Sequence, residues 1–287
     1  MNQSFTDRLF VLLLQILPHH LLSRLMMWLT RWDWEPLKNW AIRKFIRLFR
    51  VDMSQAQEQN PEAFPSFNAF FTRALKADAR PICGAQQLAV PADGKISAFG
   101  SIEQNRIIQA KGMDYSLLEL VGNDREMSKL FQDGHFATIY LSPRDYHRIH
   151  MPYSGKLLRM HHVPGRLFSV NAATARTLPR LFTRNERVVS LFDTEAGPMA
   201  VILVGAIFVG AMDTVWEGTV APADLRVSSW HYIENHRTVE LLKGGEMGRF
   251  NMGSTVIVLF PKDTLTWDEK IKEGATVKMG ESLARLT

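Results

Sequence analysis

The sequence predicts an α+β fold, in which amphipathic helices at the N terminus precede a β-rich, barrel-like or barrel-sandwich body. Three observations support this prediction. Apolar residues recur at helical spacing before residue 50, short β-branched runs punctuated by Gly and Pro follow residue 88, and no long helical pattern alternates with those runs. The last observation argues against a doubly wound parallel sheet, which needs strands and helices in alternation.

The first fifty residues differ from the rest in charge and in tryptophan content. They hold eight basic and three acidic side chains, and therefore the whole net charge of +5, together with four of the seven tryptophans. The apolar run at 9–17 is about half as long as the roughly twenty residues that a membrane-spanning helix needs. Between Leu37 and Phe49, apolar residues recur at helical spacing with basic residues between them. We expect two or three short amphipathic helices that lie in a membrane interface.

Two other interpretations of this segment stay open. The helices could pack against the protein's own core, as amphipathic helices usually do. A cleaved signal peptide is the other, since Arg8 precedes a short apolar run, although no small-x-small cleavage site follows. A polar stretch at 51–60, followed by Pro61 and Pro65, marks the expected boundary. We therefore expect a membrane-associating helical segment at 1–60 and a β-rich domain at 61–287.

Beyond this boundary the expected elements are short. A helix is expected where Phe67, Phe70 and Phe71 cluster, and strands are expected at 88–90, 136–141, 188–192, 199–209 and 255–260. The stretch at 271–286, with two glycine turns around Val277, resembles the hairpin of lipoyl- and biotinyl-carrier modules. This likeness supports the fold class and not a carrier function. With Cys83 as the single cysteine, no internal disulfide can form.

A Gly-Ser-Thr step at 253–255 opens the last predicted strand and allows two interpretations. The first is a turn or bulge before the strand. The second begins with Gly253, which lacks a Cβ and can adopt backbone angles that leave its carbonyl open to the Ser254 hydroxyl. Attack would form an ester, elimination would release the upstream chain, and hydrolysis of the resulting dehydroalanine would leave a pyruvoyl group. The tripeptide alone does not decide between them, because a motif match is only a hypothesis.

Several segments resemble those of the phosphatidylserine decarboxylases and follow that family's order. The most specific is Met-Gly-Ser-Thr at 252–255, preceded by Glu-Met-Gly-Arg-Phe at 246–250. The family's most familiar motif has leucine where Met252 stands, and the two side chains have similar volumes. The other matching segments are 67–73, 80–82, 91–94, 109–112, 141–152, 165–171, 185–187 and 197–200. The N-terminal fifty residues match in character and not in motif.

The resemblance implies a role for four side chains. The chain would cleave itself between Gly253 and Ser254 into a large chain, 1–253, and a small chain, 254–287. Ser254 would be both the attacking hydroxyl and the source of the pyruvoyl cofactor. His150 would be the base, Asp93 would orient and stabilise that histidine, and His147 would assist decarboxylation or the following protonation. Without the resemblance, Asp93 reads as a turn residue and both histidines as ordinary half-buried or solvated ones.

The resemblance also implies a reaction and a location. As a carboxy-lyase, the enzyme would convert phosphatidylserine to phosphatidylethanolamine and CO₂. The pyruvoyl ketone would form a Schiff base with the substrate's amine and accept the electrons that CO₂ leaves behind. The expected partners are an anionic phospholipid surface, the two chains of one precursor, and a second copy in a homodimer. The expected location is peripheral, on the cytoplasmic face of the cell membrane, and no metal is expected.

Three rival classes remain open from the residues alone. A serine hydrolase would use Ser254, His150 and Asp93 on an external lipid ester. A non-catalytic membrane-binding protein would use residues 1–50 and stay uncut. A metalloenzyme would use four histidines as ligands: His147, His150, His161 and His162. Two of these, His161 and His162, are adjacent, unlike the usual spacing of metal ligands. Nucleic-acid binding is disfavoured, because the chain beyond residue 50 carries no net charge.

Overall fold

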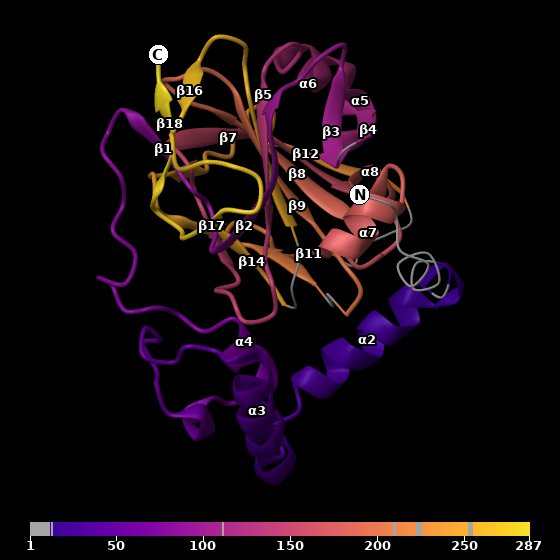
Figure 1. Cartoon of the computed structure of the whole chain (residues 1–287), viewed down its shortest axis with the longest axis vertical. Helices are drawn as coiled ribbons and strands as arrows, with labels where there is room; N and C mark the ends of the chain where they lie inside the picture. Colours follow the sequence, from indigo (N-terminus) through magenta and orange to yellow (C-terminus); the bar gives the residue numbers. More distant parts are fainter. Residues whose placement is uncertain (1–11, 13, 111, 209–210, 222–225, 252–254) are drawn as a thin grey trace.

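The structure is a computed structural model, and it describes residues 12, 14–110, 112–208, 211–221, 226–251 and 255–287. Figure 1 shows a β-rich body with three helices gathered at the end away from the C terminus: α2 (His19–Thr30), α3 (Glu35–Phe49) and α4 (Phe67–Phe71). The 3₁₀ helix η1 (Pro61–Ala63) lies between α3 and α4 in the chain. The remaining helices are one or two turns long: α5 (Leu117–Leu120), α6 (Arg125–Leu130), α7 (Ala172–Thr177) and α8 (Leu181–Arg184). Helices and sheets together confirm the α+β class.

A nine-stranded antiparallel sheet forms the centre of the body. Its order is β12 (Ser228–His231), β7 (Gly155–Val163), β8 (Arg187–Asp193), β9 (Met199–Val204), β15 (Thr255–Phe260), β5 (His135–Tyr140), β2 (Gly94–Ser101) and β17 (Thr276–Val277), with β13 (Glu240–Leu241) beside β7. All six residues of β15 are buried between β5 and β9. A continuous apolar and β-branched run suits a strand that is covered on both faces.

Smaller sheets flank the central one. One has the order β1 (Gln87–Ala89), β18 (Ser282–Leu286), β16 (Leu265–Trp267), and another β11 (Gly218–Ala221), β10 (Met212–Thr214), β14 (Glu246–Phe250), β6 (Arg148–His150). A hairpin joins β3 (Arg106–Ala110) and β4 (Met113–Ser116). Closure into a barrel would require the two edge strands of a sheet to pair with each other. No such pair exists among the described strands, so the expected barrel is not confirmed.

The predicted positions of single helices and strands were more accurate than the predicted strand pairing. The short helix and four of the five strands form where expected, as α4, β1, β5, β8 and β15. The strand expected at 199–209 ends at Val204, where the Gly205 N–H turns to the Glu186 carbonyl. The C-terminal hairpin is wrong: β17 pairs with β2, whereas β18 pairs with β1 and β16. The intervening turn, with Gly280 at φ +90°, sends the two strands into different sheets.

The N-terminal helices pack in two different ways. Helix α3 contributes to a small core of its own, whose buried members are Ile42, Val51, Phe64 and Phe70. Helix α2 buries polar residues instead, namely His19, Ser23 and Thr30, and exposes Leu21, Leu25 and Trp28. Its polar side faces the body, since His20 Nε2 donates to the Gly165 carbonyl at 2.9 Å. The first predicted apolar run, 9–17, lies largely outside the described residues.

Within the described part of the chain, no helix combines the length and the apolar character that crossing a bilayer would require.

Candidate active site

Two of the predicted site residues lie where β6 runs beside β14. His150 ends β6, and His147 lies just before its first residue. The strands are antiparallel, so Glu246 pairs with His150, and the Phe250 N–H donates to the His147 carbonyl at 3.0 Å. Both histidines therefore lie beside the strand that leads towards residues 252–254.

The His150 ring has hydrogen bonds at both of its nitrogens. Nδ1 lies 2.8 Å from the Gly244 carbonyl, which can only accept, so Nδ1 carries the proton. Nε2 then accepts from the Tyr146 hydroxyl at 3.0 Å. Burial lowers the pKa of His150, while the carboxylates of Glu246 and Asp93 act in the opposite direction. His150 is therefore a neutral imidazole with its basic nitrogen facing a phenol.

The His147 ring is fully buried and only half satisfied. Its Nδ1 donates to the Asp145 carbonyl at 2.8 Å, which leaves Nε2 as an unprotonated acceptor. Nε2 has no hydrogen-bond partner among the described residues. Burial, followed by the nearby Arg73 cation, lowers the pKa of His147 to about 3. A lone pair that is buried and unpaired costs free energy, and such groups are commonly kept for a ligand or a reaction.

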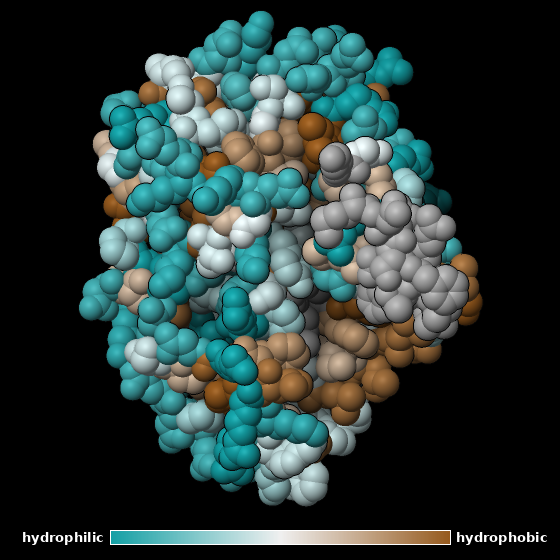
Figure 2. All heavy atoms as spheres, viewed as in Figure 1, coloured by the Kyte–Doolittle hydropathy of each residue, from teal (hydrophilic) through white to brown (hydrophobic). Residues whose placement is uncertain are grey.

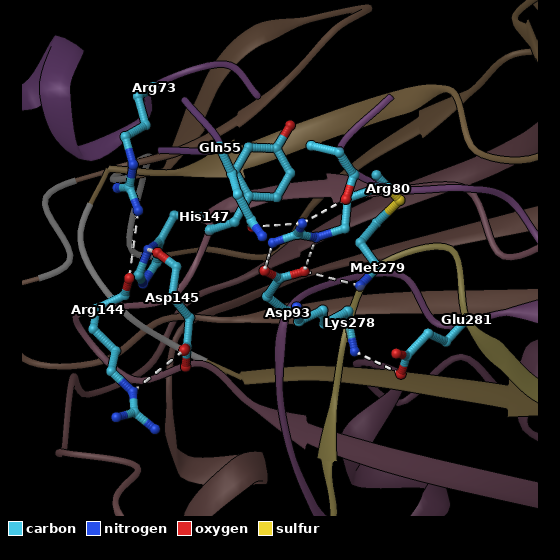
Figure 3. Close-up of polar contacts among 12 residues, drawn as sticks. Gln55, Arg73, Arg80, Asp93, Arg144, Asp145, His147, Lys278, Met279 and Glu281 are labelled. Atoms are coloured by element: carbon cyan, nitrogen blue, oxygen red, sulfur yellow. Dashed lines mark hydrogen bonds and ion pairs between the residues drawn. The ribbon is translucent and has the colours of Figure 1, made fainter. Parts of the chain in front are cut away.

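Asp93 lies in the turn before β2 and holds a buried network together. Its carboxylate accepts from Arg80 Nε at 2.9 Å, from Arg80 Nη2 at 2.5 Å and from the Met279 N–H at 2.9 Å, as Figure 3 shows. A Cβ added to the adjacent Gly94 would lie 2.4 Å from the Tyr140 carbonyl oxygen, so only glycine allows this approach of β2 to β5. Asp93 therefore links the start of β2 to the C-terminal segment.

The structure brings Asp93 and His150 near each other but does not join them by a hydrogen bond. The His150 N–H donates to the Pro91 carbonyl at 2.9 Å, which places the turn of Asp93 beside the histidine. Both ring nitrogens of His150 are taken by Tyr146 and Gly244, however. The charge of Asp93 only partly opposes the lowering of the His150 pKa by burial, and the expected orienting contact between Asp93 and the ring is not formed.

Gly253 and Ser254 lie outside the described residues, but both of their flanks are held firmly. Before them, Asn68 Nδ2 donates to the Asn251 backbone carbonyl at 3.3 Å and to its side-chain oxygen at 3.1 Å. After them, Thr255 pairs with Tyr140 on β5 and with Val204 on β9. The step between two anchored points is the place where sequence analysis predicts the cut.

Two apolar hollows lie beside α3. One of about 220 Å³ is found at the start of β15, and its wall includes Phe71, Tyr140, Leu141, Ser169, Ile207 and Phe45. Phe71 also touches the His147 ring, with 4.1 Å between ring centroids. A larger hollow of about 460 Å³ lies between α2 and α3 and shares Phe45 with the first. Apolar side chains therefore extend from α2 and α3 to Phe71, which contacts the His147 ring.

The two other histidines that sequence analysis considered lie elsewhere, on β7. His161 is bonded to Ser229 and Asp124, and His162 to Glu186. Neither joins His147 or His150, and among the described residues no group of three or more His, Cys, Asp or Glu is arranged to hold a metal ion.

Comparison with known proteins places the chain among its relatives. The sequence profile described as phosphatidylserine decarboxylase matches residues 67–285, and a second profile, described as PSD, matches residues 9–50. The chain belongs to the phosphatidylserine decarboxylase family. The family suggested by the resemblance is thereby confirmed, and so is the expectation that the chain is an enzyme, a phosphatidylserine decarboxylase.

Curated relatives extend the match over nearly the whole chain. The phosphatidylserine decarboxylase proenzyme of Azotobacter vinelandii is 52% identical over 281 residues, which cover 97% of this chain and 98% of that protein. The proenzyme of Pseudomonas aeruginosa PAO1 is 52% identical over 287 residues, 98% of each chain. That of Bordetella pertussis is 52% identical over 282 residues, 98% of this chain and 95% of the relative.

Sequence analysis did not assign the partners that complete the site. Arg80, which binds Asp93, and Arg73, which lies near His147, have no role predictable from local pattern. Tyr146, which bonds His150, was likewise not assigned a role. All three lie within the segments shared with the family, at 67–73, 80–82 and 141–152, so the shared motifs were the available signal.

Proposed function

We propose that this chain is a self-cleaving proenzyme that converts phosphatidylserine to phosphatidylethanolamine and CO₂ with a pyruvoyl group made from Ser254. The names of relatives at 52% identity support both the reaction and the processing. One observation of the structure carries the proposal. His147 and His150 lie beside β14, and the chain continues from that strand to the Gly253–Ser254 step.

The proposed cleavage needs only groups of the chain and one water molecule. Ser254 Oγ attacks the carbonyl carbon of Gly253, and the peptide C–N bond gives way to an ester. Removal of the Cα proton of residue 254 then breaks its Cβ–O bond, and Gly253 departs with a carboxylate. Water converts the dehydroalanine to the pyruvoyl group and releases ammonia. The neutral His150 is the proposed base, and the Tyr146 hydroxyl, which now occupies its Nε2, has to turn away or pass the proton on.

Other residues of the site fit the second reaction. The pyruvoyl group supplies a sink for the electrons that remain when CO₂ departs. His147 Nε2 is a buried acceptor without a partner among the described residues, which fits a site where the substrate amine donates a hydrogen bond. Asp93 is proposed to favour positive charge on His150 from close range.

The mass of the purified protein tests this function directly. We expect a 34-residue fragment, 254–287, whose amino end carries a ketone, and decarboxylase activity that is lost on treatment with borohydride. The Ser254→Ala variant should remain one uncut polypeptide. An unbroken wild-type chain that is active on lipid, or that reacts with serine-directed phosphonates, would contradict the proposal.

We further propose that α2 and α3 hold the enzyme on the membrane surface. Helix α2 turns its apolar side away from the body: Leu21 is 66%, Leu25 51% and Trp28 55% exposed. Figure 2 shows hydrophobic side chains gathered over this region. Burying one such side chain in lipid contributes roughly 1.5–3 kcal/mol, against about 1 kcal/mol for a basic residue near an anionic leaflet. Apolar burial should therefore provide most of the affinity, and the basic residues should direct the protein to the anionic, cytoplasmic leaflet.

A further inference from the structure

Arg73 is a buried cation that has no carboxylate partner within the described part of the chain. It follows α4 and is only 5% exposed. One guanidinium nitrogen, Nη2, lies 3.4 Å from the Arg144 carbonyl, and Nε has no hydrogen-bond partner among the described residues. The planar group lies over the Phe70 ring, 5.5 Å from its centroid. A buried guanidinium with so few acceptors is unusual, because a charge taken out of water is costly unless it is paired.

The carboxylates nearest to Arg73 are occupied by other groups. Asp93 binds Arg80 through two nitrogens, and Asp145 accepts from the Ser142 N–H at 2.7 Å and lies 3.8 Å from Arg144 Nε. Burial lowers the pKa of Arg73, and the opposing effect of these acids from a distance does not cancel it. Among the described residues, Arg73 therefore has no carboxylate within ion-pair distance, although Asp93 and Asp145 lie in the same cluster (Figure 3).

Arg73 also shares its surroundings with the unsatisfied nitrogen of His147. Figure 3 shows the guanidinium of Arg73 and the ring of His147 turned towards the same Arg144–Asp145 stretch of backbone. The Arg73 charge is one cause of the lowered pKa of His147, as expected for close neighbours. One group offers N–H donors and a positive charge, and the other offers a lone pair. A ligand with both an oxyanion and an ammonium would satisfy the two at once.

We propose that Arg73 binds the phosphodiester of the serine phospholipid headgroup, while the headgroup's amine faces His147. This inference rests on the proposed function, which supplies a substrate with an ammonium, a carboxylate and a phosphodiester. Binding the carboxylate would stabilise the charge that disappears in the reaction, and would thus favour the ground state over the transition state. The phosphodiester keeps its charge throughout, and a guanidinium matches its geometry.

The test uses glycerophosphocholine, which has the phosphodiester but neither a carboxylate nor a primary amine. Its binding to the full-length Ser254→Ala chain, measured by titration calorimetry, does not depend on self-cleavage or on a pyruvoyl group. We expect Arg73→Gln to weaken this binding at least tenfold and Arg73→Lys to weaken it less. Arg106→Gln is the matched control, since Arg106 lies on the β3–β4 hairpin, is half exposed and pairs with Asp114, and binding should not change.

A second measurement separates the sources of the oxyanion. In the chain that retains Ser254, Arg73→Gln should leave the fragment 254–287 in place and raise KM for phosphatidylserine at least tenfold, with kcat within about threefold of wild type. If Arg73→Gln weakened glycerophosphoserine but not glycerophosphocholine, the carboxylate would be the ligand and the proposal would be overturned. It would also be overturned if Arg73→Gln blocked self-cleavage while glycerophosphocholine bound normally. Failure of the wild type to cleave itself would contradict the proposed function, but it would not affect the calorimetric test of Arg73.

Discussion

Removing the Asp93 carboxylate should destabilise the protein strongly, and the structure indicates by how much. The Arg80 and Asp93 side chains are 7% and 12% exposed, and Asp93 also accepts from the Met279 N–H. Asp93→Ala leaves a buried guanidinium without its counter-ion, which costs about 3–5 kcal/mol. For a chain of this size each kcal/mol lowers the Tm by roughly 2–4 °C, so a fall of about 6–20 °C is expected.

The assay is thermal unfolding of the full-length chain in the Ser254→Ala background, so that every sample is uncut. Asp114→Ala is the matched control, since Asp114 pairs with Arg106 on the surface, and an exposed pair contributes only about 0–1 kcal/mol. Adding Arg80→Met to Asp93→Ala should recover much of the lost stability, because the unpaired charge is removed. In the background that retains Ser254, self-cleavage of this double variant should remain slower than that of the wild type, because His150 no longer has the negative charge of Asp93 beside it.

Equal Tm values for Asp93→Ala and Asp114→Ala would refute the reasoning, since they would mean that the buried pair contributes no more than a surface one. Normal self-cleavage by the stabilised double variant would refute the electrostatic role of Asp93 while leaving its structural role intact.

Two further predictions concern pH and the membrane. The pKa of His147 is about 3 in the folded chain and about 6.5 when unfolded, so between these values only the unfolded chain binds the proton, and stability falls as the pH is lowered. Urea unfolding should show a loss of about 1–2 kcal/mol from this group between pH 6.5 and pH 5, and His147→Asn should abolish that part of the total loss. Leu21→Glu and Leu48→Glu, at positions 66% and 69% exposed, should each weaken co-sedimentation with anionic vesicles by about tenfold or more. Leu242→Glu, 77% exposed beyond β13, should have no effect, and an equal loss in all three would argue against a membrane face on α2 and α3.

The sequence was a good guide wherever a few neighbouring residues decide the outcome. A cluster of phenylalanines sufficed for α4, and continuous β-branched runs sufficed for β8 and β15, because such segments bury themselves on either face. The C-terminal hairpin failed for the opposite reason. Strand β17 pairs with β2, and β18 pairs with β1 as well as with the nearby β16; β2 and β1 lie nearly 200 residues earlier, and no local pattern records that distance.

The same distinction between local and distant residues holds for the candidate site. Motifs shared with the family identified His147, His150 and Asp93, and the fold brings these three to one region. Their partners could not be predicted, since Asp93 binds Arg80 and Met279, which are 13 and 186 residues away. Helix α2 shows a further limit: its periodicity predicted an amphipathic helix, but only the packed structure shows that the polar side faces inwards.

The position of β15 fixes when the proposed processing can happen. This strand lies in the middle of the central sheet, yet it comes from the last 34 residues of the chain, and so do β16, β17 and β18. A ribosome that has not yet released these residues cannot complete the sheet, and the anchor at Thr255, after the proposed scissile bond, is then missing. Under the proposed function, maturation would therefore follow synthesis of the C-terminal segment. That segment pairs with the rest of the chain at four places, β15 with β5 and β9, β17 with β2, and β18 with β1, so it would stay bound after the cut.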